Sequence, residues 1–162
     1  MATLSAFFID DHIGLWALLR HAMARPGQLE GDTFSVFRAE LLRHIALEDM
    51  MLAAIRRVGR SETLPLGHRL RVEHRAITSL LVAEPTPALA TEIVSILKPH
   101  RQAEEEGLYP ICDQLLGGEA DELLRAFESY PPVAIAPGED APGPHQCAAD
   151  ALAAAARSLR GE

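Results

Sequence analysis

Two pairs with the pattern H-x-x-x-E limit the possible folds of this chain more than any other feature. They are His44 with Glu48 and His100 with Glu104. On an α-helix, residues four apart point the same way and lie about 6 Å apart, so each pair aims an imidazole and a carboxylate at one point. Both pairs fall on apolar stripes that normally carry core side chains. Buried carboxylates need partners, and a metal ion can supply them.

The spacing of the apolar residues around these pairs predicts long helices. We expect them over about residues 10–24, 32–58, 68–84 and 87–116. Asp10 or Asp11 is expected to cap the first helix and Asp32 the second, because short polar side chains accept hydrogen bonds from the first free N–H groups. Thr86 is expected to cap the fourth, with Pro87 at its first position.

Pro99 lies inside the expected fourth helix and predicts a kink just before His100. Proline lacks a backbone donor and crowds the carbonyl four residues earlier. Residues 119–130 read as a short fifth helix, residues 131–145 as a Pro/Gly-rich loop or linker, and residues 146–162 as an alanine-rich helical tail. The tail is expected to pack either on the rest of the domain, residues 1–130, or on a second subunit.

Composition excludes several classes of protein. The chain is 48% hydrophobic and 23% charged, which excludes wholesale disorder. A net charge of −8 without a basic block argues against nucleic acid or a membrane as a partner. The first apolar run is too short for a signal peptide or a membrane span, so we expect a cytoplasmic protein. Cys112 and Cys147 lack ligand spacing and are expected to be reduced thiols.

Single histidines on the other two long helices complete the candidate site. His12 and His74 each occupy a core position of their predicted helix. A lone core histidine is more often hydrogen-bonded than metal-bound, but four helices that each contribute imidazole or carboxylate at one level indicate a metal centre. The candidate ligands are His12, His44, Glu48, His74, His100 and Glu104.

This order of ligands resembles the hemerythrin-like family, specifically its HHE cation-binding domain, over about residues 8–116. The Glu104-Glu105 doublet and Leu108-Tyr109-Pro110 also resemble that family's fourth-helix motif. The resemblance implies an all-α fold, an up-down-up-down four-helix bundle, with two iron ions in a non-heme di-iron centre. Zinc or manganese would suit the same donor atoms.

Glu48 and Glu104 are expected to bridge the two metals, with the four histidines as terminal ligands. The oxygen carriers of the family have their fourth-helix carboxylate five residues after the histidine, where this chain has Glu105. Glu105 therefore stays a rival of Glu104. The helical period favours Glu104, which lies about 40° from His100, against about 140° for Glu105. The carriers also have a second histidine one turn from His74, which is absent here.

The remaining histidines are expected outside the site. His21 lies about 180° around the helix from His12 and should face outward. His68 lies at a helix start and His145 in the Pro/Gly-rich segment, so both are expected to face solvent.

Tyr109 is about 180° from His100 in a regular helix, so we expect it to pack outside the site. Trp16 is expected to fill space between helices. Glu73, Asp49 and Glu106 read as surface charges, although Asp11 or Glu73 is an alternative acceptor for the second N–H of a ligand histidine.

These patterns predict a di-iron protein that binds or senses a small diatomic ligand, O2 or NO, or that handles iron. Six protein groups cannot saturate two six-coordinate irons, so an open position is expected. One alternative is a di-iron enzyme: an oxidase, a peroxidase, or an NO-consuming or iron-sulfur-repair protein. Another is a helical interaction module with zinc or an empty site. A homodimer through the C-terminal helix is also a prediction.

Overall fold

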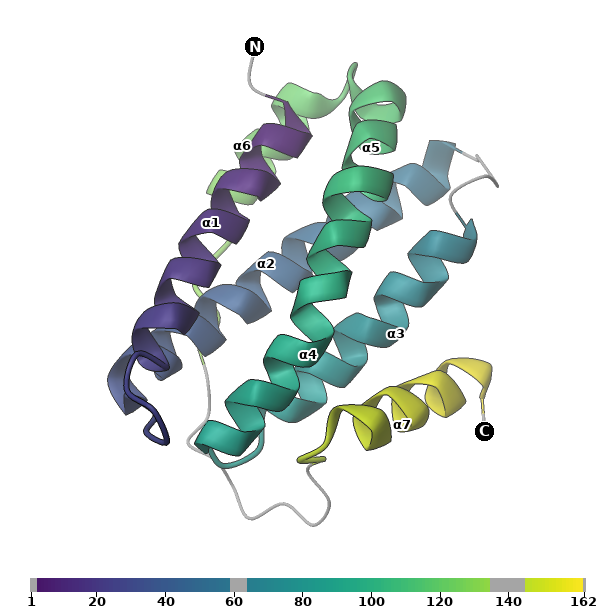
Figure 1. Ribbon diagram of the computed structural model, residues 1–162. Coiled ribbons are helices and arrows are strands. Elements are labelled where there is room, and N and C mark those ends of the chain that lie inside the picture. The colour runs from purple at the N-terminus through teal and green to yellow at the C-terminus, as the bar shows by residue number, and fades with distance from the viewer. Residues whose placement is uncertain (1–2, 59–63, 135–144, 162) are drawn as a thin grey trace.

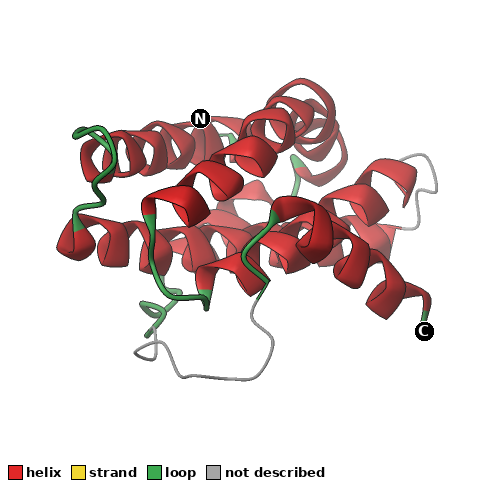
Figure 2. Ribbon diagram, turned by 60° about the horizontal axis from the view of Figure 1, so that its bottom comes forward, coloured by secondary structure: helices red, strands yellow, loops and turns green. Residues whose placement is uncertain are grey.

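The computed structural model describes residues 3–58, 64–134 and 145–161, and within these ranges the fold is all-helical, without a strand (Figures 1 and 2). The elements are α1 (Leu4–Ala22), α2 (Gly31–Val58), α3 (Leu64–Leu81), α4 (Pro87–Ala103), the π-helical turn η2 (Glu104–Leu108), α5 (Tyr109–Leu116), α6 (Ala120–Glu128) and α7 (Ala148–Arg160). The all-α prediction is confirmed.

Side-chain caps determine where the first two helices begin, and two predicted caps are wrong. The hydroxyl of Thr3 accepts a hydrogen bond from the N–H of Ala6 at 3.1 Å, so α1 begins well before Asp10 and Asp11. The carboxylate of Glu30 accepts from the N–H groups of residues 32 and 33, at 3.1 and 2.7 Å. Glu30, and not Asp32, therefore caps α2.

The fourth long helix begins as predicted. Thr86 accepts a hydrogen bond from the N–H of Leu89 at 3.1 Å, and Pro87 occupies the first turn. Pro99 lies inside α4, which continues as α-helix to Ala103. The π-helical turn η2 follows directly after α4, and the kink before His100 stays a prediction. The third helix begins at Leu64 and ends at Leu81, a few residues before its predicted bounds at each end.

The long helices pack side by side (Figure 1). α1 lies against α2, α3 contacts both α2 and α4, and α5 contacts α1 and α2. Buried apolar residues form two clusters. One contains Leu15, Leu19 and Phe37, and the other contains Phe8 and Met51. On α1, His12 lies between Phe8 of one cluster and Leu15 of the other. On α2, His44 and Glu48 likewise lie between Leu41 and Met51. Apolar packing therefore adjoins the site at both ends.

The C-terminal helix α7 packs on α3 and α4. Its buried face consists of small residues, Ala148, Ala151 and Ala155. The N–H of Ala148 donates to the carboxylate of Glu92 at 2.9 Å, and this bond from α4 satisfies a free donor at the start of α7. Of the two expected positions for the tail, the structure shows the one on the rest of the domain. A homodimer through the C-terminal helix stays a prediction.

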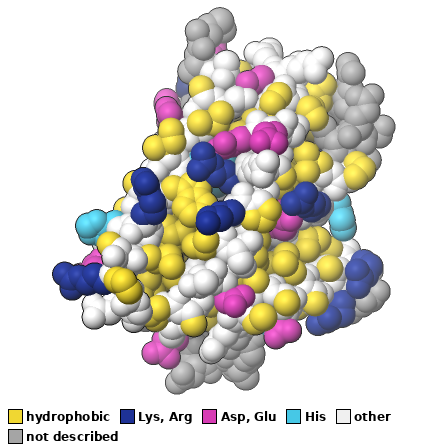
Figure 3. Space-filling view, in the orientation of Figure 1, with side chains coloured by type: hydrophobic (Ala, Val, Ile, Leu, Met, Phe, Trp, Pro, Cys, Tyr) yellow, Lys and Arg dark blue, Asp and Glu magenta, His cyan; other side chains and the backbone are white. Residues whose placement is uncertain are grey.

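The remaining observations concern the predicted Pro/Gly-rich loop, the two cysteines, the length of the helices and the surface. Residues 131–134 contain neither helix nor strand, as expected, while residues 135–144 of the predicted loop lie outside the described residues. Cys112 is buried and Cys147 exposed, and both are free thiols. Among the described helices, none is long and apolar enough to cross a membrane. On the face in Figure 3, basic and acidic side chains are interspersed with hydrophobic ones.

Candidate metal centre

The structure brings the six predicted site residues together. They form two groups: His12 and His44 with Glu48 and Glu104, and His74 and His100 with the same Glu48 and Glu104. Within each group the ligand atoms lie within 4.8 Å of one another. All six side chains are buried, and the two carboxylates are fully enclosed at 0% exposure. Buried histidine and glutamate groups in this arrangement can hold a metal ion.

Four helices and the π turn place these side chains. The i, i+4 spacing aligns His44 with Glu48 on α2, where Nε2 and Oε2 lie 3.4 Å apart. The same spacing aligns His100 on α4 with Glu104, and Nε2 lies 2.7 Å from Oε1.

His12 and His74 enter from the two remaining long helices. His12 Nε2 lies 3.4 Å from Oε2 of Glu104. His74 Nε2 lies 3.2 Å from Oε2 of Glu48 and 3.4 Å from Oε1 of Glu104. Glu104 thus presents one oxygen to the His12 side and the other to the His74 and His100 side, which is the arrangement of a bridging carboxylate.

Each histidine uses its other ring nitrogen to contact a carboxylate at the edge of the site. His44 Nδ1 lies 3.1 Å from Asp11, and His100 Nδ1 lies 2.7 Å from Glu73. Both carboxylates were candidates for this role, although Glu73 reads first as a surface charge in the sequence. A proton on Nδ1 donated to these carboxylates leaves the lone pair of Nε2 directed toward the centre, as metal-binding histidines require.

Two further carboxylates complete this outer set. Asp49 lies 3.2 Å from His74 Nδ1. The prediction that Asp49 is only a surface charge was wrong: its side chain is half exposed but reaches the ring. Glu105 lies 2.9 Å from His12 Nδ1 and also pairs with Arg101 at 2.7 Å. Glu105 is therefore placed outside the ligand groups, where it orients an imidazole.

Three of the atoms that face the centre lack hydrogen-bond partners. Within the described part of the chain, His44 Nε2, Glu48 Oε2 and Glu104 Oε2 are buried and form no hydrogen bond. Neighbouring ligand atoms lie near them, but without hydrogen-bond alignment. Leaving such groups unpaired costs about 1–3 kcal/mol each, and more when they are charged. All three are atoms that a metal ion would bind, so the donor set fits a bound metal.

Electrostatics also favour positive charge at this point. Burial lowers the pKa of His44, but the charge of Glu48 and the hydrogen bond to Asp11 outweigh burial and raise it to about 10. Burial and the charge of Glu48 raise the pKa of Glu104, but His100 and His12 outweigh them and lower it to about 2. The pKa values of His74 and His100 are also raised, so in the metal-free protein protons on His44, His74 and His100 offset the negative charge of the carboxylates. A metal ion would replace those protons.

Tyr109 corrects one sequence-based prediction. It is fully buried, and its hydroxyl donates a hydrogen bond to Oε1 of Glu48 at 2.5 Å and lies 3.2 Å from His12 Nε2. Burial, followed by the charges of Glu48 and Glu104, raises its pKa far above the usual range. The phenol therefore points into the site and does not pack outside it.

The π-helical turn explains the difference. In η2 the N–H of Tyr109 bonds to the carbonyl of Glu104, five residues back. A π turn takes up one additional residue, so Tyr109 lies about 80° from His100 and not about 180°. Pro110 supplies a cause, because it has no N–H for the carbonyl of Glu106 and its ring crowds that carbonyl. Pro110 was the sequence signal that could have revealed the shift.

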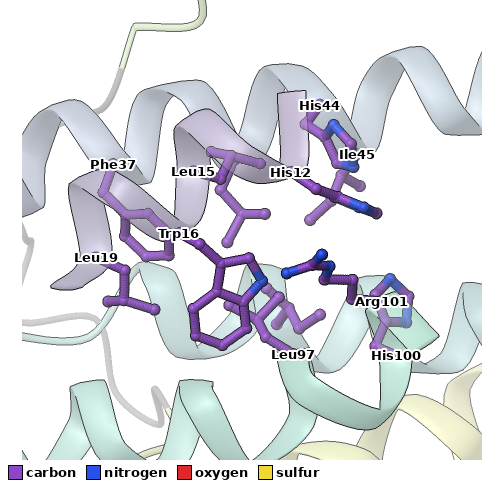
Figure 4. Close-up of a pocket in the computed structure, with 12 residues that line it drawn as sticks. His12, Leu15, Trp16, Leu19, Phe37, His44, Ile45, Leu97, His100 and Arg101 are labelled. Carbon is purple, nitrogen blue, oxygen red and sulfur yellow. The ribbon is translucent and has the colours of Figure 1, made fainter. Parts of the chain in front are cut away.

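A small cavity of about 20 Å³ adjoins the centre (Figure 4). His12, His44 and His100 line one end, and apolar side chains such as Leu15 and Leu19 line the other. This volume holds about one or two water-sized molecules.

Two residues on neighbouring helices border the cavity near the protein surface. Trp16 and Arg101 lie on α1 and α4, and the guanidinium of Arg101 points between Trp16 and His12 (Figure 4). In Figure 3, hydrophobic side chains occupy the surface between these helices, with basic ones beside them. Trp16 does fill space between helices, as predicted, but it also lines the cavity.

The histidines predicted to lie outside the site belong to neither ligand group. His21 and His68 are exposed, as expected, whereas His145 is half-buried. Glu106 is exposed, and within the described residues its carboxylate accepts hydrogen bonds only from the side chain of Gln102. This fits a surface charge.

Comparison of the chain with protein-family models, with curated proteins and with solved structures finds no match.

Proposed function

We propose that this chain is a hemerythrin-like protein of the HHE type, a four-helix bundle that binds two metal ions. One observation carries the proposal: two four-residue groups share Glu48 and Glu104. Shared carboxylates are the usual way to hold two cations side by side, because the two oxygens of one carboxylate can bind different metals. Each ion would then have two histidines of its own and two carboxylates in common.

The donor atoms favour iron as the resident metal, with manganese and zinc as the other candidates. Imidazole nitrogen and carboxylate oxygen suit all three metals. Two histidines and two shared carboxylates give each ion four protein groups, fewer than the six that iron commonly accepts. When bound, a pair of reduced irons supplies an open coordination position and electrons to a small ligand.

The adjoining cavity supports a diatomic ligand. Its volume of about 20 Å³ suits a molecule about the size of water, and most of its lining is apolar. An uncharged molecule such as O2 or NO loses little hydration on entering such a space, whereas a charged organic substrate would lose much more. We therefore propose that the protein binds or senses O2 or NO, or handles iron through the same centre.

Metal analysis combined with absorption spectroscopy tests this proposal. The purified chain is loaded with ferrous iron without oxygen, and its spectrum is recorded before and after exposure to air and to NO. The expected result is about two irons per chain and a stable adduct that reverses when the gas is removed. Turnover of peroxide or NO would instead favour a di-iron enzyme. Protein that remains colourless, with zinc or with no metal, would overturn the di-iron proposal.

A further inference from the structure

Tyr109 lies within reach of one of the two proposed metal positions. Its hydroxyl oxygen is 3.2 Å from His12 Nε2 and 2.5 Å from Oε1 of Glu48, and the side chain is fully buried. The ring is stacked against Phe8, with centroids 5.4 Å apart and planes 21° apart. The phenol is thus fixed by packing at its ring and directed at the ligand set by its oxygen.

The distance to His12 is that expected between two ligands of one metal. Two donor atoms bound at right angles to one ion, each about 2.1 Å from it, lie about 3 Å apart. The oxygen of Tyr109 and Nε2 of His12 are at nearly this separation. In the metal-free chain the phenol is hydrogen-bonded both to Glu48 and to Nε2 of His12, and these two partners are themselves proposed metal ligands.

We propose, building on the proposed two-metal function, that Tyr109 is a further protein ligand to the metal held by His12 and His44. When the ion binds, the O–H bond of the phenol breaks, the oxygen electron pair binds the metal, and the proton is released to the buffer. No electron is transferred. Phenolate oxygen is a hard, anionic donor that suits ferric iron, as the tyrosine ligand of catalase haem illustrates.

This ligand makes the two metal positions unequal. The chain has only one other tyrosine, Tyr130, which follows α6. The metal between His74 and His100 would therefore keep its open position, whereas the metal beside His12 would be more nearly saturated. The cavity is lined by His12 and His44 of one group and by His100 of the other, so it adjoins both ligand groups.

Ferric iron bound to phenolate absorbs visible light by charge transfer, and excitation in that band enhances phenolate ring vibrations in the resonance Raman spectrum. The chain is loaded with ferrous iron alone and oxidised in air, and iron content is measured on the same samples. We compare the wild type with Tyr109→Phe and with Tyr130→Phe as the matched control. Wild-type protein is also produced in cells supplied with ring-deuterated tyrosine. The deuterium shift of its ring vibrations is a test that needs no substitution.

The expected result is a visible band and deuterium-sensitive ring vibrations in the wild type. Both should be lost in Tyr109→Phe and kept in Tyr130→Phe. The deuterium shift in the wild type, together with the Tyr130→Phe result, decides the assignment even if Tyr109→Phe binds less iron.

Two different failures can be distinguished. Two ferric irons without the phenolate bands, or bands that persist in Tyr109→Phe, would overturn the tyrosine ligand and leave the metal centre standing. A wild-type chain that binds no iron would overturn both.

Discussion

Neutralising Glu104 should damage metal binding far more than neutralising its neighbour Glu105. The two carboxylates are adjacent in sequence, and the ligand spacing of hemerythrin-like proteins left both as candidates. The structure separates them: Glu104 lies between His12 and His100, at 3.4 and 2.7 Å from their Nε2 atoms, whereas Glu105 contacts the outer nitrogen of His12. Glu104→Gln and Glu105→Gln remove the same charge from positions one residue apart.

The expected magnitudes follow from these positions. Two unit charges 4 Å apart interact by about 4 kcal/mol at an effective dielectric constant of about 20. That energy corresponds to about a thousandfold in Kd. Glu104 would lie closer than this to divalent ions, so Glu104→Gln should weaken binding by at least about that factor. Loss of a carboxylate that only orients a ligand histidine costs about 10–100-fold, which is the effect expected of Glu105→Gln.

Competition between the protein and a chromogenic chelator for zinc measures these affinities, because zinc suits the same donors and cannot change oxidation state. Circular dichroism of each metal-free variant controls for folding. Equal losses in the two variants, or a larger loss in Glu105→Gln, would refute the assignment of Glu104 as the shared ligand.

Three further predictions concern histidine ligation, pH and packing. His74→Ala should reduce the metal content of the purified chain, whereas His21→Ala, on the exposed face of α1, should not; equal metal in both would contradict the ligand assignment. In metal-free protein the pKa of His44 is raised to about 10 and that of Glu104 lowered to about 2. The stability contributed by His44 is therefore complete below about pH 6.5 and is lost as pH rises toward 10, whereas that of Glu104 is complete above about pH 4.5 and is lost toward pH 2. Urea midpoints of the metal-free chain across this range should peak between about pH 4.5 and 6.5, and a flat profile would contradict both shifts. Phe8→Ala should lower the free energy of unfolding by about 3–5 kcal/mol in urea titrations, because Phe8 is fully buried against Tyr109, and a loss below about 1 kcal/mol would show that the ring does not pack there.

Helical periodicity was sufficient to predict which ligand candidates come together. His44 and Glu48 lie on one face because they are four residues apart, and the apolar residues around them show that this face is buried. His12 and His74 were predicted because each takes a core position in its own helix. These patterns depend only on the rise and rotation of an α-helix, which the sequence specifies locally.

Features that depend on departures from regular helix were not predicted. Tyr109 was placed outside the site because the π turn at residues 104–108 was not anticipated. Asp49 was read as a surface charge because helical angles say little about how far a flexible carboxylate reaches. The cavity beside Trp16 depends on how side chains from different helices fill the space between them, which single-helix patterns do not contain.

The most direct test of a shared two-metal centre is a crystal structure of the iron-loaded chain, with anomalous scattering recorded at the iron edge. We expect two iron peaks about 3.5–4 Å apart. One should lie beside His12 and His44 and the other beside His74 and His100, with Glu48 and Glu104 contacting both. A single ion, or iron bound only at the surface while these six side chains remain unligated, would contradict the account.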